Sequence, residues 1–260
     1  MGDSKIKRLD FPVQQDGSFT AGKRMEKIAF ASEMEDAEPN RLLYFMNEIL
    51  APANSAGEVA LVHEPVNQVQ ETRLAWLYNP GQRRVLRAPE LAYDSPGIGA
   101  DGLRTNDDLN GFNGAPDRYN WKLVGKQEMY IPYNSYKLID KSNTFERLIE
   151  PKFLNRDVQR YEKHRVWVVE ATLKPGTSHQ YTKRTFYIDE DSWMVVLTDK
   201  YDARGQLWRT SEQHNINYAD LPMQAPSIEV HYDLQSGRYL AMGLRNDEKT
   251  VYTPITRSNA

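Results

Sequence analysis

Short segments in which apolar and polar residues alternate recur along this chain, with turn residues between them. From Ile228 to Leu234, isoleucine, valine, tyrosine and leucine alternate with glutamate, histidine and aspartate. A period of two predicts an extended strand with one buried face and one wet face. Other segments of strand length are 24–31, 41–50, 58–65, 72–78, 82–87, 121–131, 165–173, 183–189, 193–200, 206–218 and 238–245. About ten to twelve strands, mostly joined by short hairpins, favour an antiparallel meander, sandwich or barrel.

Helix signals are few. Asn143-Thr144-Phe145-Glu146 resembles a capping box that opens a short helix over Thr144–Ile149, and single turns are expected at Thr105–Asp108 and Pro89–Leu91. Two longer stretches, 94–119 and 140–161, lack strand patterning, and loops of that length inside a domain are usually functional. No shift in composition marks a linker, so we expect a single domain over 1–260 with flexible ends at about 1–10 and 254–260.

Composition excludes several classes of protein. The 260 residues include no cysteine, which rules out thiol catalysis, disulfides and cysteine-based metal centres. The net charge of −3 argues against nucleic acid as a partner. No run of 18 apolar residues occurs, so no membrane-spanning helix is expected, and Met1–Lys5 lacks the apolar stretch of a signal peptide.

Motifs for catalysis or metal binding are weak. A literal G-x-G-x-x-G at Gly97–Gly102 lacks a strand before it and a helix after it, so no cofactor is predicted. The five histidines lack zinc-site spacing and no G-x-S-x-G is present, although a carboxylate pair for hydrolysis remains an alternative. One stretch gathers oxygen ligands for calcium, but turn capping explains the same residues and no metal is predicted: Asp101, Asp107, Asp108, Asn110, Asn113 and Asp117.

The aromatic residues carry the stronger signal. The 15 Tyr, 8 Phe and 5 Trp fall largely on or beside the expected strands, and several segments are apolar on both faces. With almost no helix to cover it, such a sheet is expected to curve around an apolar interior, which is either packed solid or holds a ligand. The residues expected to line this interior are Phe45, Trp76, Trp121, Trp167, Tyr187, Trp193 and Trp208.

Five sequence blocks, in order, resemble the DUF1329 family, which is similar to the LolA/LolB outer-membrane lipoprotein-sorting proteins. They are LYNPGQRRVLRAP (77–89), DGLRT (101–105), FNGAPDRYNWKLVGK (112–126), HRVWVVEATLK (164–174) and KRTFYIDEDSW (183–193). The resemblance extends over roughly residues 28–241. It implies an incomplete antiparallel β-barrel, a LolA-like half-barrel, with short helices or loops as a lid. It also implies a periplasmic protein of a Gram-negative envelope, made with a signal peptide that this chain lacks.

The resemblance implies a binding or carrier protein for a lipid, acyl chain or other hydrophobic ligand, with outer-membrane lipoprotein or lipid trafficking as one such role, and without catalysis. An envelope transporter or outer-membrane protein is the expected partner. Two alternatives stay open: an envelope protein-interaction module without a small ligand, and a carboxylate-based hydrolase. We expect the 94–119 stretch, together with 140–161, to form the mouth or lid, through Arg104, Asp107, Asp108, Asn113, Asp117, Arg118 and Tyr119. The absence of cysteine favours a soluble carrier over a lipid-anchored receptor.

Overall fold

A computed structural model describes residues 4–88, 91, 93–218, 223–244, 246 and 253–254, which form one antiparallel sheet. Thirteen strands are neighbours in the order β6-β5-β4-β3-β2-β1-β13-β12-β11-β10-β9-β8-β7, and β14 pairs with β1. The prediction of a mainly β, antiparallel open barrel is confirmed, with slightly more strands than expected. Their bounds are β1 Ser4–Val13, β2 Gly22–Phe30, β3 Arg41–Ala51, β4 Val59–Pro65, β5 Leu74–Asn79, β6 Arg84–Arg87, β7 Tyr119–Pro132, β8 Tyr161–Leu173, β9 Lys183–Asp189, β10 Val195–Tyr201, β11 Leu207–Tyr218, β12 Met223–Asp233, β13 Arg238–Met242 and β14 Thr253–Pro254.

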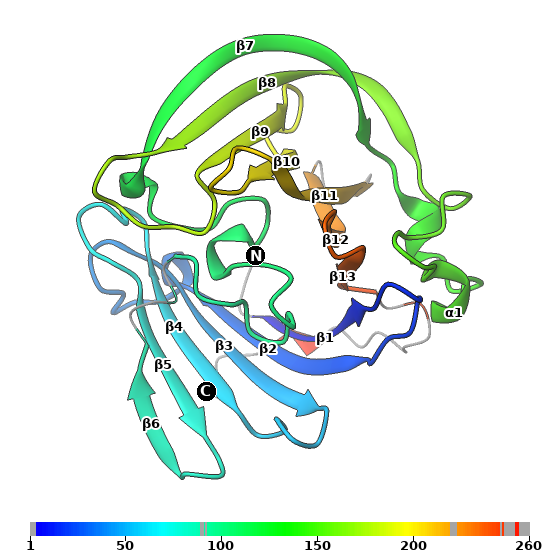
Figure 1. The fold of residues 1–260 in the computed structure, drawn as a ribbon. Coiled ribbons are helices and arrows are strands. Elements are labelled where there is room, and N and C mark those ends of the chain that lie inside the picture. Colours follow the sequence, from blue (N-terminus) through cyan, green and yellow to red (C-terminus); the bar gives the residue numbers. More distant parts are fainter. Residues whose placement is uncertain are drawn as a thin grey trace.

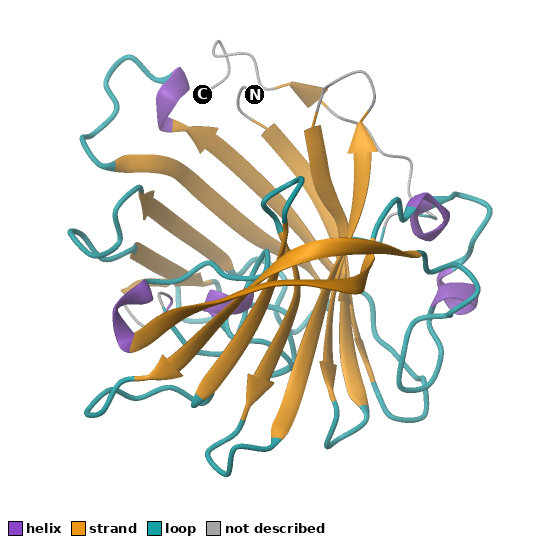
Figure 2. Ribbon diagram, turned by 90° about the horizontal axis from the view of Figure 1, so that it is seen from above, coloured by secondary structure: helices purple, strands orange, loops and turns teal. Residues whose placement is uncertain are grey.

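The sheet consists of two meanders that meet at one seam. Strands β1 to β6 form the first and β7 to β13 the second, and the pairing of β1 with β13 joins them, with Phe11 opposite Ala241. The sheet curves strongly: one edge strand, β6, lies at the lower left of Figure 1, and the other, β7, arches over the top. Seen from above, the long β7–β8 pair crosses the other strands obliquely (Figure 2).

The predicted flexible end at about 1–10 does not hold for residues 4–10, because residues 4–13 form β1 in the middle of the sheet; residues 1–3 lie outside the described residues. Leu9, Phe11 and Val13 are buried on one face of this strand. Their alternation with polar residues is visible in the sequence, but the charged residues that precede them are typical of a chain end exposed to solvent. The predicted flexible end at 254–260 lies outside the described residues, apart from Pro254 in β14.

The main apolar core lies on the outer face of the curved sheet. Strands β1, β12 and β13 contribute Phe11, Val230 and Ala241, and the connection between β7 and β8 contributes buried leucine and isoleucine side chains. That connection holds the 3-10 helix η5 (Tyr136–Ile139) and the helix α1 (Phe145–Leu148), with the predicted Thr144 accepting a hydrogen bond from the Arg147 N–H at its start. The 140–161 stretch therefore covers the back of the sheet at the seam between the meanders.

The connection between β6 and β7 runs through the inside of the curve instead of around it (Figure 1). Its described part, residues 93–118, contains two short 3-10 helices, η3 (Asn106–Asp108) and η4 (Pro116–Arg118). The turn expected at Thr105–Asp108 is confirmed, with a capping box between Thr105 and Asp108. The turn expected at Pro89–Leu91 falls mostly outside the described residues. We call residues 93–118 the inner segment, and the sheet face that it covers the inner face.

Candidate functional site

A buried arginine fastens the inner segment to the first meander. The Arg73 guanidinium donates from Nε to Glu64 Oε2 at 2.7 Å and from Nη2 to Glu64 Oε1 at 3.0 Å. It also donates to the Leu91 carbonyl at 2.8 Å and to Asn113, at the carbonyl oxygen (2.8 Å) and at Oδ1 (2.7 Å). Because one side chain joins β4 to two points of the β6–β7 connection, the segment is held in place on this side.

An ionic cluster fastens the same segment to the second meander. Asp107 Oδ2 lies 2.8 Å from Arg184 Nη2 and 3.0 Å from His179 Nε2, and Asp108 Oδ2 lies 3.2 Å from Lys200 Nζ. All five side chains are buried. Burial alone would raise the pKa of both carboxyls, but Arg184 and His179 bring that of Asp107 below its ordinary value, and Lys200 and Arg184 do the same for Asp108. Both carboxylates are therefore ionised, and they compensate cations that β9 and β10 place inside.

Next to this cluster, Ser211, His231 and Glu229 form a row of close polar contacts on the inner face. Ser211 Oγ lies 2.7 Å from His231 Nδ1, and His231 Nε2 lies 3.1 Å from Glu229 Oε1. Burial lowers the pKa of His231, whereas that of Glu229 falls to about 2, against the effect of burial, through His231 and Arg104. The row has the residue types of a serine hydrolase triad. However, Lys200 donates to Ser211 Oγ, and neither Ser211 nor His231 lines any of the cavities described below.

Residues 228–234 thus alternate between two faces as predicted, but the face that we expected to be exposed to solvent is buried. Glu229, His231 and Asp233 are buried on the inner face, while Ile228 and Val230 are buried on the outer face. The inner segment and the cations of neighbouring strands supply the hydrogen bonds and charges that water would otherwise supply. A period of two therefore assigns residues to the two faces of this strand, but it does not show which face is exposed to solvent.

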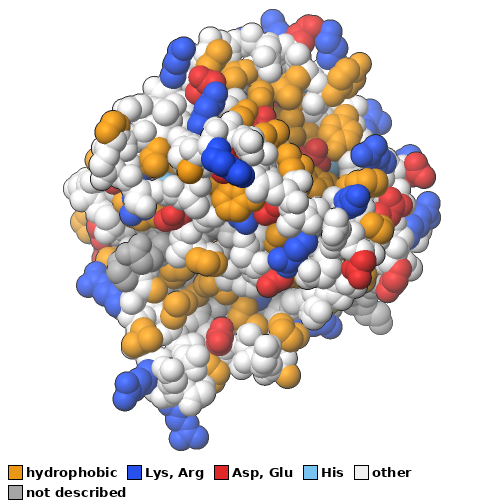
Figure 3. Space-filling view, viewed as in Figure 1, with side chains coloured by type: hydrophobic (Ala, Val, Ile, Leu, Met, Phe, Trp, Pro, Cys, Tyr) orange, Lys and Arg blue, Asp and Glu red, His pale blue; other side chains and the backbone are white. Residues whose placement is uncertain are grey.

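A cavity of about 320 Å³ remains between the inner segment and strands β2 to β4. Figure 3 shows hydrophobic side chains gathered in a hollow over these strands, beside the inner segment. Its apolar lining comes from Ile28, Leu43, Phe45, Val62, Leu91, Ile98, Leu109 and Phe112. Its polar lining comes from Arg8, Arg24, Glu26, Asn47, Glu64, Arg73, Arg104 and Asn113. The volume is at the lower end of the range for small-molecule sites, and the wall is amphipathic.

Of the seven aromatic residues predicted to line an interior, two lie at this cavity or next to its wall. Phe45 lines this cavity directly. Trp121 stacks on Phe186 at 5.6 Å and packs edge-on against Phe112 of the inner segment at 5.2 Å, while its Nε1 donates to the Pro116 carbonyl. These contacts place Trp121 next to the cavity wall without making it part of the lining.

The other five lie elsewhere. Strand register puts Trp76 opposite Leu61, on the face away from Phe45, where it lines a shallow outer depression with Tyr78 and Val85. Trp167 stacks on Trp193, which is 70% exposed. The remaining two make polar contacts, Tyr187 to Asp199 and Trp208 to Asp233. The structure therefore does not bring the seven residues together around one cavity.

The residues predicted at a mouth or lid also lie in different environments and do not form one group. Asp107, Asp108 and Tyr119 are buried, and the Tyr119 hydroxyl donates to the Tyr181 carbonyl at 2.8 Å. Arg104 and Asn113 line the cavity. Asp117 is exposed and accepts from the Tyr93 hydroxyl, and the Arg118 guanidinium lies 3.4 Å from the centre of the same ring. The segment is thus anchored inside the curve of the sheet, with exposed residues such as Asp101 and Asp117 along it.

Sequence reasoning missed Arg8, Arg24 and Glu26 as cavity residues. In β2, Arg24 and Glu26 are buried on the inner face, whereas the intervening Met25 is half-buried on the outer face. Charged residues at alternate positions normally indicate a solvated face. The one available signal was that Arg24 and Glu26 are two residues apart, so their side chains lie on the same face of a strand and can form an ion pair.

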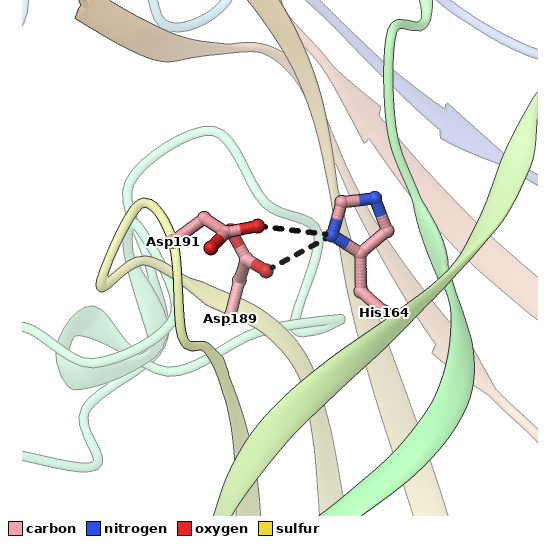
Figure 4. A group of neighbouring side chains, drawn as sticks. All are labelled: His164, Asp189 and Asp191. Atoms are coloured by element: carbon pink, nitrogen blue, oxygen red, sulfur yellow. Dashed lines mark ion pairs between the residues drawn. The ribbon is translucent and has the colours of Figure 1, made fainter.

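A third group of side chains, His164, Asp189 and Asp191, offers donor atoms for a metal ion, and Figure 4 shows it. His164 Nδ1 lies 3.4 Å from Asp189 Oδ1 and 3.6 Å from Asp191 Oδ2. Asp189 Oδ2 accepts hydrogen bonds from the Ser192 N–H and hydroxyl. These contacts tie the turn between β9 and β10 to β8, and we assign the group this structural role.

Comparison with known proteins places the chain among relatives. The family model described as "Protein of unknown function (DUF1329)" matches residues 2–259. The protein named "Uncharacterized protein PA3922" of Pseudomonas aeruginosa is 52% identical over 243 residues, which are 92% of this chain and 53% of that protein. This chain therefore spans about half the length of that curated relative. None of the helices in the described ranges is long and apolar enough to cross a membrane.

Three solved structures share the fold. One from Vibrio parahaemolyticus, which carries the name of an outer membrane lipoprotein-sorting protein domain, has a TM-score of 0.63 at 15% identity and covers 99% of this chain and 88% of its own. A DUF1329 family protein from Desulfovibrio piger gives 0.60 at 14% identity, over 92% and 82%. The LolA superfamily protein NE2245 from Nitrosomonas europaea gives 0.54 at 14% identity, over 93% and 83%. This chain belongs to the DUF1329 family and has a LolA-like fold.

Proposed function

We propose that this protein is a carrier that binds a hydrophobic ligand in the cavity between the inner segment and strands β2 to β4. The observation that carries the proposal is this partly enclosed space with a continuous apolar strip on its floor. Register places Ile28 opposite Phe45 and Phe45 opposite Val62, so the strip crosses three neighbouring strands. Burying an alkyl chain there gains about 0.8 kcal/mol per CH₂ group.

The anchoring of the inner segment supports this proposal. Because Arg73 on one side and the Asp107–Asp108 cluster on the other hold the segment, the roof of the cavity is formed before a ligand arrives. Preorganisation of this kind lowers the entropic cost of binding. Asp117 and Arg118, which we predicted at the mouth, are not among the residues that line this cavity.

The setting that we propose is the periplasm of a Gram-negative cell, with an outer-membrane protein or envelope transporter as the partner that supplies or receives the ligand. The support is the shared fold with a domain named for lipoprotein sorting and with a LolA superfamily protein. We propose no chemistry for the protein. The serine–histidine–glutamate row is the nearest arrangement to a catalytic triad. In it, Lys200 donates a hydrogen bond to Ser211 Oγ, and neither Ser211 nor His231 lines the cavity.

A pair of tryptophan substitutions on one strand tests the proposal. Val62 lines the cavity, whereas its neighbour Leu61 points to the outer depression. We expect Val62→Trp to abolish binding of a fluorescent alkyl probe, and Leu61→Trp to leave it unchanged, with circular dichroism verifying that both variants fold. Loss of binding in Leu61→Trp alone, or full binding by Val62→Trp, would contradict the proposed site. Native mass spectrometry of protein taken from the periplasm would identify the ligand.

A further inference from the structure

The cavity proposed as the ligand site contains a buried cation without a matching carboxylate. Arg104 of the inner segment is only 4% exposed and lines the cavity. Its Nη1 donates to the carbonyl of the adjacent Thr105 at 2.9 Å, and its Nε has no hydrogen-bond partner. Among the described residues, none presents a carboxylate oxygen within 4.0 Å of this guanidinium.

The neighbouring carboxylates are already engaged by other cations. Arg24 Nε lies 3.0 Å from Asp10 Oδ2 and 3.2 Å from Glu26 Oε1, and Arg8 Nε lies 2.7 Å from the other oxygen of Glu26. Arg8 and Arg24 thus hold the carboxylates of Asp10 and Glu26, and Arg104 has no ion pair of its own with either of them.

Glu229 attracts Arg104 through space, but its oxygens contact other groups and lie more than 4.0 Å from the guanidinium nitrogens. Oε1 pairs with His231, and Oε2 accepts from the Asn110 N–H at 3.1 Å. Burial, and then repulsion from Arg24, lower the pKa of Arg104. A buried guanidinium beside a second guanidinium is costly unless an anion compensates it. The cavity is where such an anion has access.

Strand register separates the charged part of the cavity from its apolar part. Arg24 and Glu26 precede Ile28 at steps of two along β2, and Asn47 follows Phe45 at the same step along β3. Glu26 is opposite Asn47, and Ile28 is opposite Phe45. The charged row and the apolar row therefore lie side by side, about 7 Å apart along the strands. Asn47 Oδ1 is buried in the charged row without a hydrogen-bond partner.

We propose that the cavity binds an amphiphile with an anionic head, a carboxylate or phosphate monoester. The head lies against Arg104 beside Arg24, and the alkyl part lies over Ile28, Phe45 and Val62. This inference rests on the proposed carrier function and specifies its ligand class. Arginine suits the role because its planar fork of donors matches the oxygens of carboxylates and phosphates.

Three ligands with the same ten-carbon chain test the inference by calorimetry: decanoate, decyl phosphate and decan-1-ol. We expect the wild-type protein to bind at least one of the two anions about ten-fold or more tighter than the alcohol, since hydrogen bonds between charged groups are the strong ones. The arm with the tighter binding distinguishes a carboxylate ligand from a phosphate ligand. Equal binding of all three would overturn the anionic head but leave the carrier proposal standing. Absence of binding by all three would count against the carrier proposal itself.

Substitution of the arginine assigns the effect to its charge. Arg104→Met should remove the preference for the anion and retain binding of decan-1-ol. Its ligand-free melting temperature should match or exceed that of the wild type, because the variant removes an uncompensated buried charge. The matched control is Arg87→Met, at an exposed position on β6, which should keep the wild-type preference. An Arg104→Met protein that still prefers the anion would refute the assignment.

Discussion

The sharpest prediction concerns Asp108, the carboxylate at the centre of the interior. Asp108 Oδ2 lies 3.2 Å from Lys200 Nζ and accepts from the Tyr181 hydroxyl and the Thr105 N–H, each at 3.1 Å. Substitution by asparagine keeps the size of the side chain and removes its charge. Lys200 and Arg184, both with less than 1% exposure, then lose a counter-charge that water cannot replace.

Breaking one partner out of a buried ion pair costs about 3–5 kcal/mol. We therefore expect Asp108→Asn to lower the free energy of unfolding by about this amount, a large part of the 5–15 kcal/mol typical of a domain. Urea unfolding, followed by circular dichroism and by tryptophan fluorescence, measures the change. The control is Asp117→Asn in the same segment, where the carboxylate is exposed and, among the described side chains, accepts a hydrogen bond from Tyr93 alone. This control should cost less than about 1 kcal/mol.

A double substitution isolates the charge effect. If the loss comes from the unpaired lysine, adding Lys200→Met to Asp108→Asn should recover part of the lost stability, because both charges are then absent. Asp108→Asn with the stability of Asp117→Asn would refute our account of the interior. So would a double variant less stable than expected from adding the two single changes.

Two further predictions concern the loss of stability at low pH and the strain caused by a side chain at a glycine position. The pKa values of Asp107 and Asp108 lie below their ordinary value of 3.8. The stability that these carboxylates contribute is therefore complete above pH 3.8 and is lost as the pH falls below 3.8. Acid titration of the wild type should show this loss of stability, and Asp108→Asn should show a shallower loss. Gly111 has φ +87°, and an added Cβ would lie 2.6 Å from Val195 Cβ. Gly111→Ala should therefore cost about 2–4 kcal/mol in urea unfolding, against about 1 kcal/mol for Gly205→Ala, which has a similar φ and an empty surrounding; equal costs would contradict the contact.

Local patterns were sufficient for much of the fold. Alternation and turn residues identified most strands, and Thr144 marked the start of α1 correctly. Helix and strand formation depend on neighbours in the sequence, so such signals can be read from one chain. The central strand β1 escaped because its buried positions, Leu9, Phe11 and Val13, follow a charged stretch that resembles a free end.

The candidate site was less accessible to sequence reasoning. Aromatic residues were expected inside, yet the inner face carries Arg24, Glu26, Arg184 and Lys200. Whether a charged residue can be buried depends on a partner far along the chain, and no local pattern specifies that partner. Of the predicted site residues, Phe45, Arg104 and Asn113 line the cavity, and their role in binding remains a prediction.

The seam between the meanders has a consequence for biosynthesis. Asp10 pairs with Met242, so β1 acquires its second neighbour only after β13, which is far along the sequence, has been made. Closing a loop of that length is entropically expensive, and folds dominated by such pairings form slowly. Each meander has local hairpins, but the inner segment acquires its counter-charges only when both are in place. A sheet with this topology is therefore complete only after β13 has been made.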